Sequence, residues 1–264
     1  MAAILRQIFG PQQRADFRPA AQNVYSIQCP LSGIILEVQN PFWRLEYPTP
    51  LVRLAEWNHG AMKSALQGIK CPVNPGHQRG GARVINLNVV VPDGQVQSFV
   101  WTWYSECLLQ DLTLKMLRSE GLTGFEVEPV TARFRKSTNR PPKLWELVVT
   151  GWAGMAKAES GIHLNQAKSC PVCGHLTYTG LINPQELIDT DKWDGSDFFM
   201  VWPMPRYVFV SQRAAKIIRD HHLTGGRLVP ISELEPTDGF APGRLHYYMP
   251  EQMARELGEP LGIY

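Results

Sequence analysis

Two related cysteine peptides constrain the fold of this chain more than any other feature. They are Cys29-Pro30-Leu31-Ser32-Gly33 and Cys170-Pro171-Val172-Cys173-Gly174. In a zinc knuckle, two thiolates three positions apart bind one metal ion, and the glycine that follows them permits a tight turn. The second peptide has both cysteines, whereas Ser32 replaces the second cysteine of the first. The sequence therefore predicts one intact knuckle and one degenerate knuckle.

The metal site predicted from these peptides is a structural zinc site. We expect Cys29, Cys170 and Cys173 to supply three sulfurs to it, because the two knuckles belong to equivalent halves of the chain. The residues leave the fourth ligand open, and the candidates are His175, His163, Cys71 and water. Loss of the metal, with the degenerate knuckle packed as an apolar turn, also stays open.

The intact knuckle has a redox dithiol as its alternative interpretation. Redox pairs normally lie at a helix N-terminus, which lowers the thiol pKa. His175-Leu176-Thr177-Tyr178-Thr179-Gly180 favours an extended strand, so the sequence favours a metal knuckle. Cys71, in a Pro-rich turn that lacks a second cysteine, is interpreted as an incidental thiol, and Cys107 as a small buried hydrophobe.

An internal repeat accompanies the two cysteine peptides. A shift of 101 residues aligns Asp93-Gly94 with Asp194-Gly195, and Leu122-Thr123-Gly124 with Leu223-Thr224-Gly225. Ten of the 38 aligned positions are identical, where average composition would give roughly two or three. This pattern predicts a duplicated supersecondary unit.

The second copy shows the shape expected of the unit. Tyr207-Val208-Phe209-Val210 favours a strand, Ser211 is a good N-cap, and residues 212–222 favour a helix that ends before Gly225. In the first copy we expect a helix from about Ser105 or Gln110 to Glu120, and a strand over residues 125–130. The predicted unit is strand, helix, glycine turn and strand.

The predicted fold class is α+β, with two pseudo-duplicated halves that each combine a knuckle-like turn, a small antiparallel sheet and this unit. The N-terminal half, residues 1–150, carries the degenerate knuckle and an insertion at about 40–81, where residues 51–66 have helical spacing. The C-terminal half, residues 151–264, carries the intact knuckle and an unduplicated tail. The remaining expectations are antiparallel strands at 131–135 and 144–150, a boundary at 151–169 and a helix at 250–257.

Composition excludes several classes of protein. Charged residues make up 19% of the chain and hydrophobic residues 44%, which is typical of a globular protein rather than a disordered one. The net charge of +2 provides no general attraction to nucleic acid. The first ten residues contain too short an apolar run for a signal peptide or a membrane span. With an odd number of cysteines, five, we expect a cytoplasmic protein with reduced thiols and no membrane partner.

Several motifs of the second half resemble a known family. They are Cys170-Pro171-Val172-Cys173-Gly174, Trp193-Asp194-Gly195-Ser196-Asp197-Phe198-Phe199, Phe209-Val210-Ser211-Gln212-Arg213-Ala214 and Leu223-Thr224-Gly225. Together with the Arg133-Phe134-Arg135 strand and the Pro141-Pro142-Lys143-Leu144 turn, they are similar to the double-CXXCG motif family. The resemblance implies an immunity protein that neutralises a cognate toxin of bacterial contact-dependent or polymorphic toxin systems.

The function expected from the sequence is therefore non-catalytic binding of a cognate toxin protein, since no catalytic motif stands out. We expect the toxin to contact the non-duplicated residues 40–81 or 240–264, with tryptophans as candidate anchors. Those tryptophans are Trp43, Trp57, Trp101, Trp103, Trp145 and Trp202, of which Trp101 and Trp202 favour the core. The alternative is a zinc-ribbon-like nucleic-acid-binding protein that uses the basic residues Arg133, Arg135, Lys136, Arg140 and Lys143.

Overall fold

The computed structural model forms two compact units, residues 1–39 and residues 40–264. The described residues are 25–28, 35–38, 41–48, 54–63, 70–75, 77, 86–164, 169–235 and 243–264. In the smaller unit, β1 (Tyr25–Gln28) pairs antiparallel with β2 (Ile35–Val38). Within the described ranges, no helix is long and apolar enough to cross a membrane.

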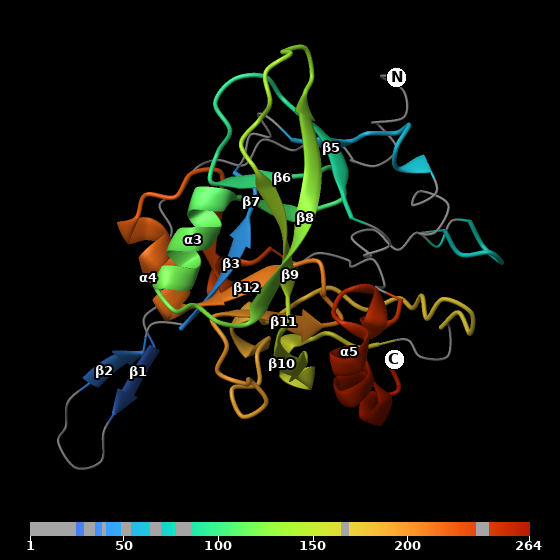
Figure 1. The fold of residues 1–264 in the computed structure, drawn as a ribbon. Helices are drawn as coiled ribbons and strands as arrows, with labels where there is room; N and C mark the ends of the chain where they lie inside the picture. The colour runs from blue at the N-terminus through green and yellow to red at the C-terminus, as the bar shows by residue number, and fades with distance from the viewer. Residues whose placement is uncertain are drawn as a thin grey trace, which may run out of the picture. The chain divides into compact units, whose positions relative to one another are not determined.

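The larger unit is an α+β structure built on two sheets, which confirms the α+β part of the predicted fold class (Figure 1). One sheet has five strands in the order β10-β11-β12-β3-β13. All its neighbouring strands are antiparallel except β10 and β11, which run parallel, so the sheet is mixed rather than purely antiparallel. Its strands are β3 (Phe42–Glu46), β10 (Gly151–Met155), β11 (Phe198–Trp202), β12 (Val208–Ser211) and β13 (Arg227–Pro230).

The second sheet has six strands in the order β4-β5-β8-β9-β7-β6. It is also mixed, because β5 runs parallel to the second half of β8. Its strands are β4 (Glu56–Trp57), β5 (Asn88–Val91), β6 (Phe99–Trp101), β7 (Cys107–Gln110), β8 (Phe125–Phe134) and β9 (Leu144–Val149).

Three α-helices are present in the described part of the larger unit, and α3 and α4 lie beside each other (Figure 1). The C-terminal end of α3 contacts the first turn of α4, because Arg213 Nη1 donates to the carbonyl oxygen of Gly121 at 3.3 Å. The helices are α3 (Asp111–Ser119), α4 (Gln212–Asp220) and α5 (Glu251–Gly258), with short 3-10 helices η1 (Ala158–Ser160), η3 (Pro184–Glu186), η4 (Ile231–Glu233), η5 (Leu245–Tyr247) and η6 (Glu259–Leu261).

The helix predictions are confirmed, with small changes at the ends. Ser211 is the N-cap of α4, and its side chain accepts a hydrogen bond from the Ala214 backbone amide. In the first copy the helix starts at Asp111 rather than at Ser105, because residues 107–110 belong to strand β7. Helix α5 begins at Glu251, one residue after the predicted start, because Pro250 is its N-cap.

Two local predictions need correction. Residues 54–62 form a bridge, strand β4 and a turn, so the helical spacing of residues 51–66 produces no helix over these positions. Lys63 is helical, and residues 51–53 and 64–66 lie outside the described residues. Strand β9 pairs with residues 125–130, whereas residues 131–134 pair with β5, because β8 is long enough to serve two neighbours. The segment 151–169 begins with the buried strand β10, and its role as the boundary between two halves stays a prediction.

The elements of the two aligned segments have the same order and the same spacing. Strand β7 and helix α3 span 107–119, and strand β12 and helix α4 span 208–220, so both pairs are separated by 101 residues. In both sheets, the strand before the helix and the strand after it are not direct neighbours. In the six-stranded sheet, β9 lies between β7 and β8, and in the five-stranded sheet, β3 lies between β12 and β13.

These two intervening strands, β9 and β3, occupy equivalent positions. Trp145 of β9 lies opposite Pro129 and Leu109, and its indole N–H donates to Asp111 at 2.9 Å. Trp43 of β3 lies opposite Pro230 and Val210, and its indole N–H donates to Gln212 at 2.7 Å. Asp111 and Gln212 are each the first residue of their helix.

The glycine turn after each helix contacts the other segment. The Thr123 amide donates to Asp197 Oδ2 at 3.1 Å, and the Thr224 amide donates to Ser98 Oγ at 3.1 Å. A Cβ atom at Gly124 would lie 2.0 Å from the Phe198 carbonyl oxygen, and one at Gly225 would lie 2.0 Å from that of Phe99. Both turns therefore require glycine for the same close approach.

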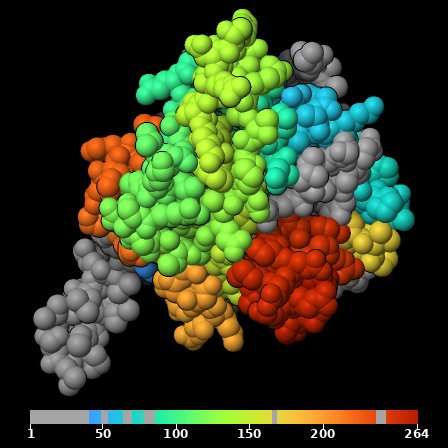
Figure 2. Space-filling model, in the orientation of Figure 1, coloured from blue at the N-terminus to red at the C-terminus, as the bar shows by residue number. Residues whose placement is uncertain are grey.

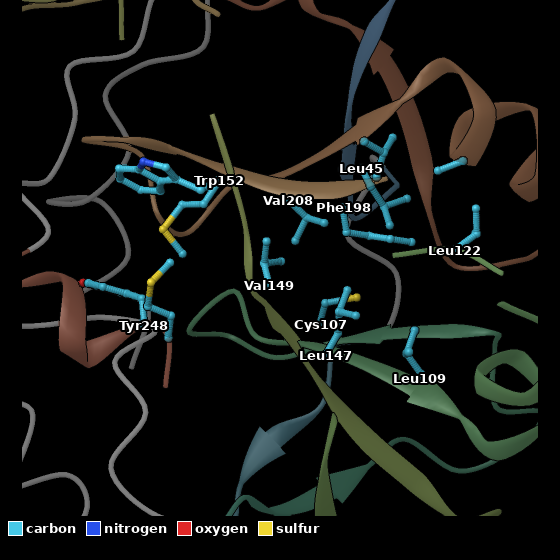
Figure 3. Packing of buried hydrophobic residues seen from close by; sticks show 14 of the residues in the cluster. Leu45, Cys107, Leu109, Leu122, Leu147, Val149, Trp152, Phe198, Val208 and Tyr248 are labelled. Carbon is cyan, nitrogen blue, oxygen red and sulfur yellow. The ribbon is translucent and has the colours of Figure 1, made fainter. Parts of the chain in front are cut away.

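The main core lies between the two sheets, and both sheets contribute to it (Figure 3). Cys107 and Leu147 come from the six-stranded sheet, while Val208 and Phe198 come from the five-stranded sheet. The predicted burial of Cys107 is confirmed, with 3% of its surface exposed. The outer faces are covered by two smaller clusters, one on each sheet.

Candidate metal centre

Four potential ligand atoms from distant parts of the chain lie within 4.8 Å of one another. They belong to Cys71, His77, Cys170 and Cys173. Cys71 Sγ lies 3.9 Å from Cys170 Sγ, and Cys173 Sγ lies 3.8 Å from His77 Nδ1. The three cysteines are buried, and they form a small cluster of their own apart from the larger cores. This arrangement can hold a metal ion.

The loop that carries Cys170 and Cys173 is a tight turn held by its own backbone. The Gly174 amide donates to the Cys170 carbonyl oxygen at 2.8 Å, and the Cys170 amide donates to the His175 carbonyl oxygen at 2.6 Å. Gly174 has φ +70°, a conformation that favours glycine. These contacts turn both thiols toward the same point.

The loop that carries Cys71 and His77 closes in a similar way. The Cys71 amide donates to the His77 carbonyl oxygen at 3.1 Å, and the His77 amide donates to the Asn74 carbonyl oxygen at 2.9 Å. Each loop thus joins the amide of its first cysteine to the carbonyl of a histidine. The rings of those two histidines, His77 and His175, stack at 4.0 Å between centroids and 5° between planes.

The orientation of the His77 ring suits a metal ligand. Its Nδ1 faces the sulfurs, while its Nε2 lies 3.0 Å from the side-chain amide of Asn74. A ligand histidine keeps its proton on the other ring nitrogen, where an outer partner fixes the ring. The Asn74 amide supplies that partner when its oxygen faces Nε2.

Hydrogen bonds prepare one thiol for metal binding. Backbone amides of Cys173 and Val172, followed by the side chain of His77, lower the pKa of Cys170 to about 6. Burial raises the pKa of Cys173 to about 11. A bound cation adds a positive charge beside both sulfurs and favours the thiolate form of each.

The C-terminal segment supports the intact knuckle. Arg244 donates from Nη2 to the Pro171 carbonyl oxygen at 3.1 Å and from Nη1 to the Tyr264 carbonyl oxygen at 2.7 Å. A Cβ atom at Gly243 would lie 2.9 Å from the Cys173 carbonyl oxygen. The segment also forms a broad part of the surface, red in Figure 2. The tail is thus packed against the candidate site.

Two of the three predicted sulfur ligands lie within the described residues. Cys170 and Cys173 are brought together as expected. Cys29 lies outside the described residues, so its role stays a prediction. Cys71 was one of four candidates for the fourth ligand, and it belongs to the cluster, so the interpretation of an incidental thiol is wrong. His163 and His175 are not among the four.

Sequence reasoning missed His77, although a signal for it exists. Cys-Pro-Val occurs at 71–73 and at 170–172, and Gly-His follows at 76–77 and at 174–175. Residues 74 and 75 of the first peptide, Asn-Pro, stand where the second has Cys173. Measured from Cys71, Leu122 is 51 positions away, and measured from Cys170, Leu223 is 53 positions away. This alignment needs no insertion of about 40 residues in the first half.

Two of the basic residues between β8 and β9 already have partners within the chain. Arg135 forms an ion pair with Glu56 at 2.7 Å. The ammonium group of Lys143 lies 3.9 Å from the centroid of the Trp145 ring. The strip therefore presents fewer free cations than its sequence indicates.

The predicted tryptophan anchors are mostly covered. Trp101 and Trp202 are in the core, as expected, and Trp57 is buried as well. Trp43 and Trp145 are partly buried against their helices. Trp103, 55% exposed, is the most accessible of the six.

No protein-family model matches this sequence, and no curated protein matches it. The family resemblance therefore rests on the motifs quoted above.

Proposed function

We propose that Cys71, His77, Cys170 and Cys173 bind one zinc ion as a structural centre. Zinc binds sulfur at about 2.3 Å in a tetrahedron, which places neighbouring sulfurs about 3.8 Å apart. The 3.9 Å separation of Cys71 and Cys170 Sγ atoms fits this geometry. Four protein ligands fill a tetrahedral site, so they leave no position for a substrate.

The metal content of the protein tests this proposal. Chain purified without added metal should contain about one zinc ion, because structural sites bind tightly. Cys173→Ser should lose most of the zinc, whereas Cys107→Ser, at a buried thiol of the main core, should retain it. Less than about 0.2 zinc per chain in the unaltered protein would reject the centre.

We further propose that residues 42–134 and 144–235 are two copies of one unit, and that the zinc ion joins them. The shared spacing of helices α3 and α4 supports this, as do the equivalent positions of Trp43 and Trp145. In this view each copy places its first strand, β3 or β9, in the sheet of the other. Each copy also supplies two metal ligands.

The function we propose is that of a non-catalytic immunity protein, which binds and neutralises a cognate bacterial toxin domain in the cytoplasm. The observation that carries it is the closed set of four ligands. Such a metal ion stabilises a scaffold and performs no chemistry, which leaves the exposed surface for binding. The resemblance to the double-CXXCG motif family supplies the toxin as partner.

The toxin interface is proposed to lie on residues 40–81 and 240–264. Each segment displays an exposed apolar side chain, Val73 with 65% of its surface accessible and Leu261 with 42%. Apolar side chains at the surface are common anchors for a protein partner when polar residues surround them. Val73 and Leu261 are therefore the residues at which we propose to test the interface.

A pull-down with the product of the neighbouring gene, coexpressed with this chain, tests the interface. Val73→Asp and Leu261→Asp should each weaken toxin binding at least about tenfold. Ile182→Asp is the matched control, because Ile182 is 70% exposed and lies outside both segments. Undiminished binding by a folded Val73→Asp, Leu261→Asp double variant would reject this placement.

Nucleic-acid binding through residues 133–143 is the alternative function. The ion pair of Arg135 and the ring contact of Lys143 give it less support, since both cations already have partners. Retention of RNA or DNA at about 0.15 M salt would favour this function over the immunity proposal. No retention at low salt would remove it.

A further inference from the structure

A second polar site lies between the two sheets, away from the cysteine cluster. It is a cavity of about 50 Å³ whose lining includes Glu106, Glu146, Arg206, Ser105 and Tyr248. Cys107, Val149 and Val208, which Figure 3 shows between the sheets, also line it. Such a volume holds a few water-sized groups, since one water needs about 10–15 Å³ on this measure.

The Glu106 carboxyl group has one satisfied and one unsatisfied oxygen. Its Oε2 accepts hydrogen bonds from the Thr102 hydroxyl and from the Trp57 indole N–H. Its Oε1 is buried and has no hydrogen-bond partner among the described residues. Glu106 is only 7% exposed and forms no ion pair in the described part of the chain. A buried carboxyl oxygen of this kind is costly unless a donor reaches it.

The local backbone fixes Glu106 in this position. Ser105, the preceding residue, has φ +72°, which is uncommon for a residue other than glycine. Arg206 Nη2 donates to the Ser105 hydroxyl at 2.9 Å and so holds the turn. The guanidinium group of Arg206 is thereby directed to the turn, and its Nε has no hydrogen-bond partner within the described ranges. Strained backbone of this kind is concentrated at binding sites.

The charges of the cavity favour a cation. The lining includes two carboxyl groups, of Glu106 and Glu146, and a single guanidinium group, of Arg206, so these three groups when fully ionised have a net charge of −1 and one added positive charge neutralises it. A primary ammonium group has three N–H donors. The Glu106 and Glu146 carboxyl groups and the Ser105 hydroxyl are acceptors along the same cavity. Divalent metal ions need more oxygen ligands than this lining supplies.

We propose that the cavity between Glu106, Glu146 and Arg206 binds a primary ammonium group, carried by a small amine or by a lysine side chain of another molecule. The proposal is independent of the toxin and of the zinc centre. Burial and the neighbouring carboxylate of Glu146 raise the pKa of Glu106 to about 8, so at pH 7 the empty site holds a proton there. Binding of the ammonium ion favours the carboxylate and releases that proton.

Calorimetric titration of the full chain with methylammonium chloride at pH 7 tests the site, at ionic strength held constant with sodium chloride. We expect one saturable site and release of about one proton per bound ion, measured by comparing phosphate and HEPES buffers, neither of which contains a primary amine. The other titratable or charged groups that face Glu106 are Glu146, Arg206, Cys107 and Tyr248. Tetramethylammonium, which is larger and has no N–H donor, should not bind.

Two variants and one peptide analogue complete the test. Glu106→Gln should weaken methylammonium binding at least about tenfold, whereas Glu126→Gln, at an exposed position of β8, should not change it. Binding of N-acetyl-lysinamide as well as methylammonium would assign the site to a protein-borne lysine, and binding of methylammonium alone would assign it to free amines. No saturable binding up to about 0.1 M, or equal binding of tetramethylammonium, would overturn the proposal even if Glu106→Gln failed to fold.

Discussion

At the scale of single residues, the glycines of the two Leu-Thr-Gly turns decide whether the two segments can dock. Gly124 has φ +81°, and its α-carbon lies against the backbone of Phe198. Gly195 has a similar φ of +83° but no atom near its missing side chain. The pair therefore separates the effect of close approach from the effect of backbone conformation.

Replacement with alanine should destabilise the protein more at Gly124 than at Gly195. Gly195→Ala should lower the free energy of unfolding by about 1–2 kcal/mol, the cost of a left-handed conformation. Gly124→Ala should cost at least about 2 kcal/mol more, because its Cβ would lie 2.0 Å from a carbonyl oxygen. Urea denaturation measures both values. Equal costs would show that the turn can move away from Phe198 freely.

Glu106 should make stability depend on pH in an unusual direction. Its pKa is raised to about 8 by burial, so between the ordinary value of 4.5 and 8 the folded chain holds a proton that the unfolded chain has released. Stability therefore falls as the pH rises through this window and levels off above about 8, with a total loss of about 5 kcal/mol at most. The difference between the denaturant midpoints at pH 5 and pH 8 should be smaller in Glu106→Gln than in the unaltered protein. An identical pH profile in that variant would contradict the assignment.

At the scale of elements, the two equivalent helices begin differently. The Ser211 hydroxyl accepts from the Ala214 amide at 3.1 Å and donates to Asp197 Oδ1 at 2.8 Å. Helix α3 starts after Gln110, which provides no side-chain cap. The N-cap of α4 is therefore part of the connection between helix and sheet.

Removing this cap should destabilise the protein measurably. Ser211→Ala should cost about 1–2 kcal/mol, since it leaves one helix amide and one carboxylate oxygen without their partner. Ser119→Ala, at the exposed C-terminal end of α3, should remain within about 0.5 kcal/mol of the unaltered protein. Thermal or urea denaturation measures the difference. A cost at Ser211 no larger than at Ser119 would exclude the cap as a stabilising contact.

At the scale of the whole molecule, the four potential metal ligands come from two loops that are distant in sequence. Cys71 and Cys170 are 99 positions apart, and each belongs to a different segment. An ion bound to both loops stabilises only the folded chain, because the unfolded chain does not hold the ligands together. The proposed zinc ion would thus couple the two loops.

This coupling predicts strongly non-additive substitutions. Cys71→Ser and Cys170→Ser should each lower the unfolding midpoint in the presence of zinc, and a chelator should lower the midpoint of the unaltered protein similarly. The double variant should lose no more than about 1 kcal/mol beyond either single variant, because the first substitution already releases the metal. Additive losses would indicate that the two thiols stabilise the fold separately, without a shared ion.

The sequence by itself determined the local elements and the close approach of Cys170 and Cys173. The helix after Ser211, the strand that begins at Phe125 and the thiols of Cys170 and Cys173 all follow from short-range patterns. Propensity, capping and glycine conformation act over a few residues, so the printed sequence contains nearly all the information that they need.

Only the tertiary structure decided which loop meets the knuckle and which strands enter each sheet. Cys71 and His77 join Cys170 through space, although a Pro-rich turn with one cysteine resembles many ordinary loops. Likewise, Trp43 lies in a sheet whose other strands come from residues 151–230, and Trp145 lies in a sheet whose other strands come from residues 56–134. Side-chain periodicity shows which face of a strand is buried but does not name its neighbour, because pairing depends on packing between residues far apart in the chain.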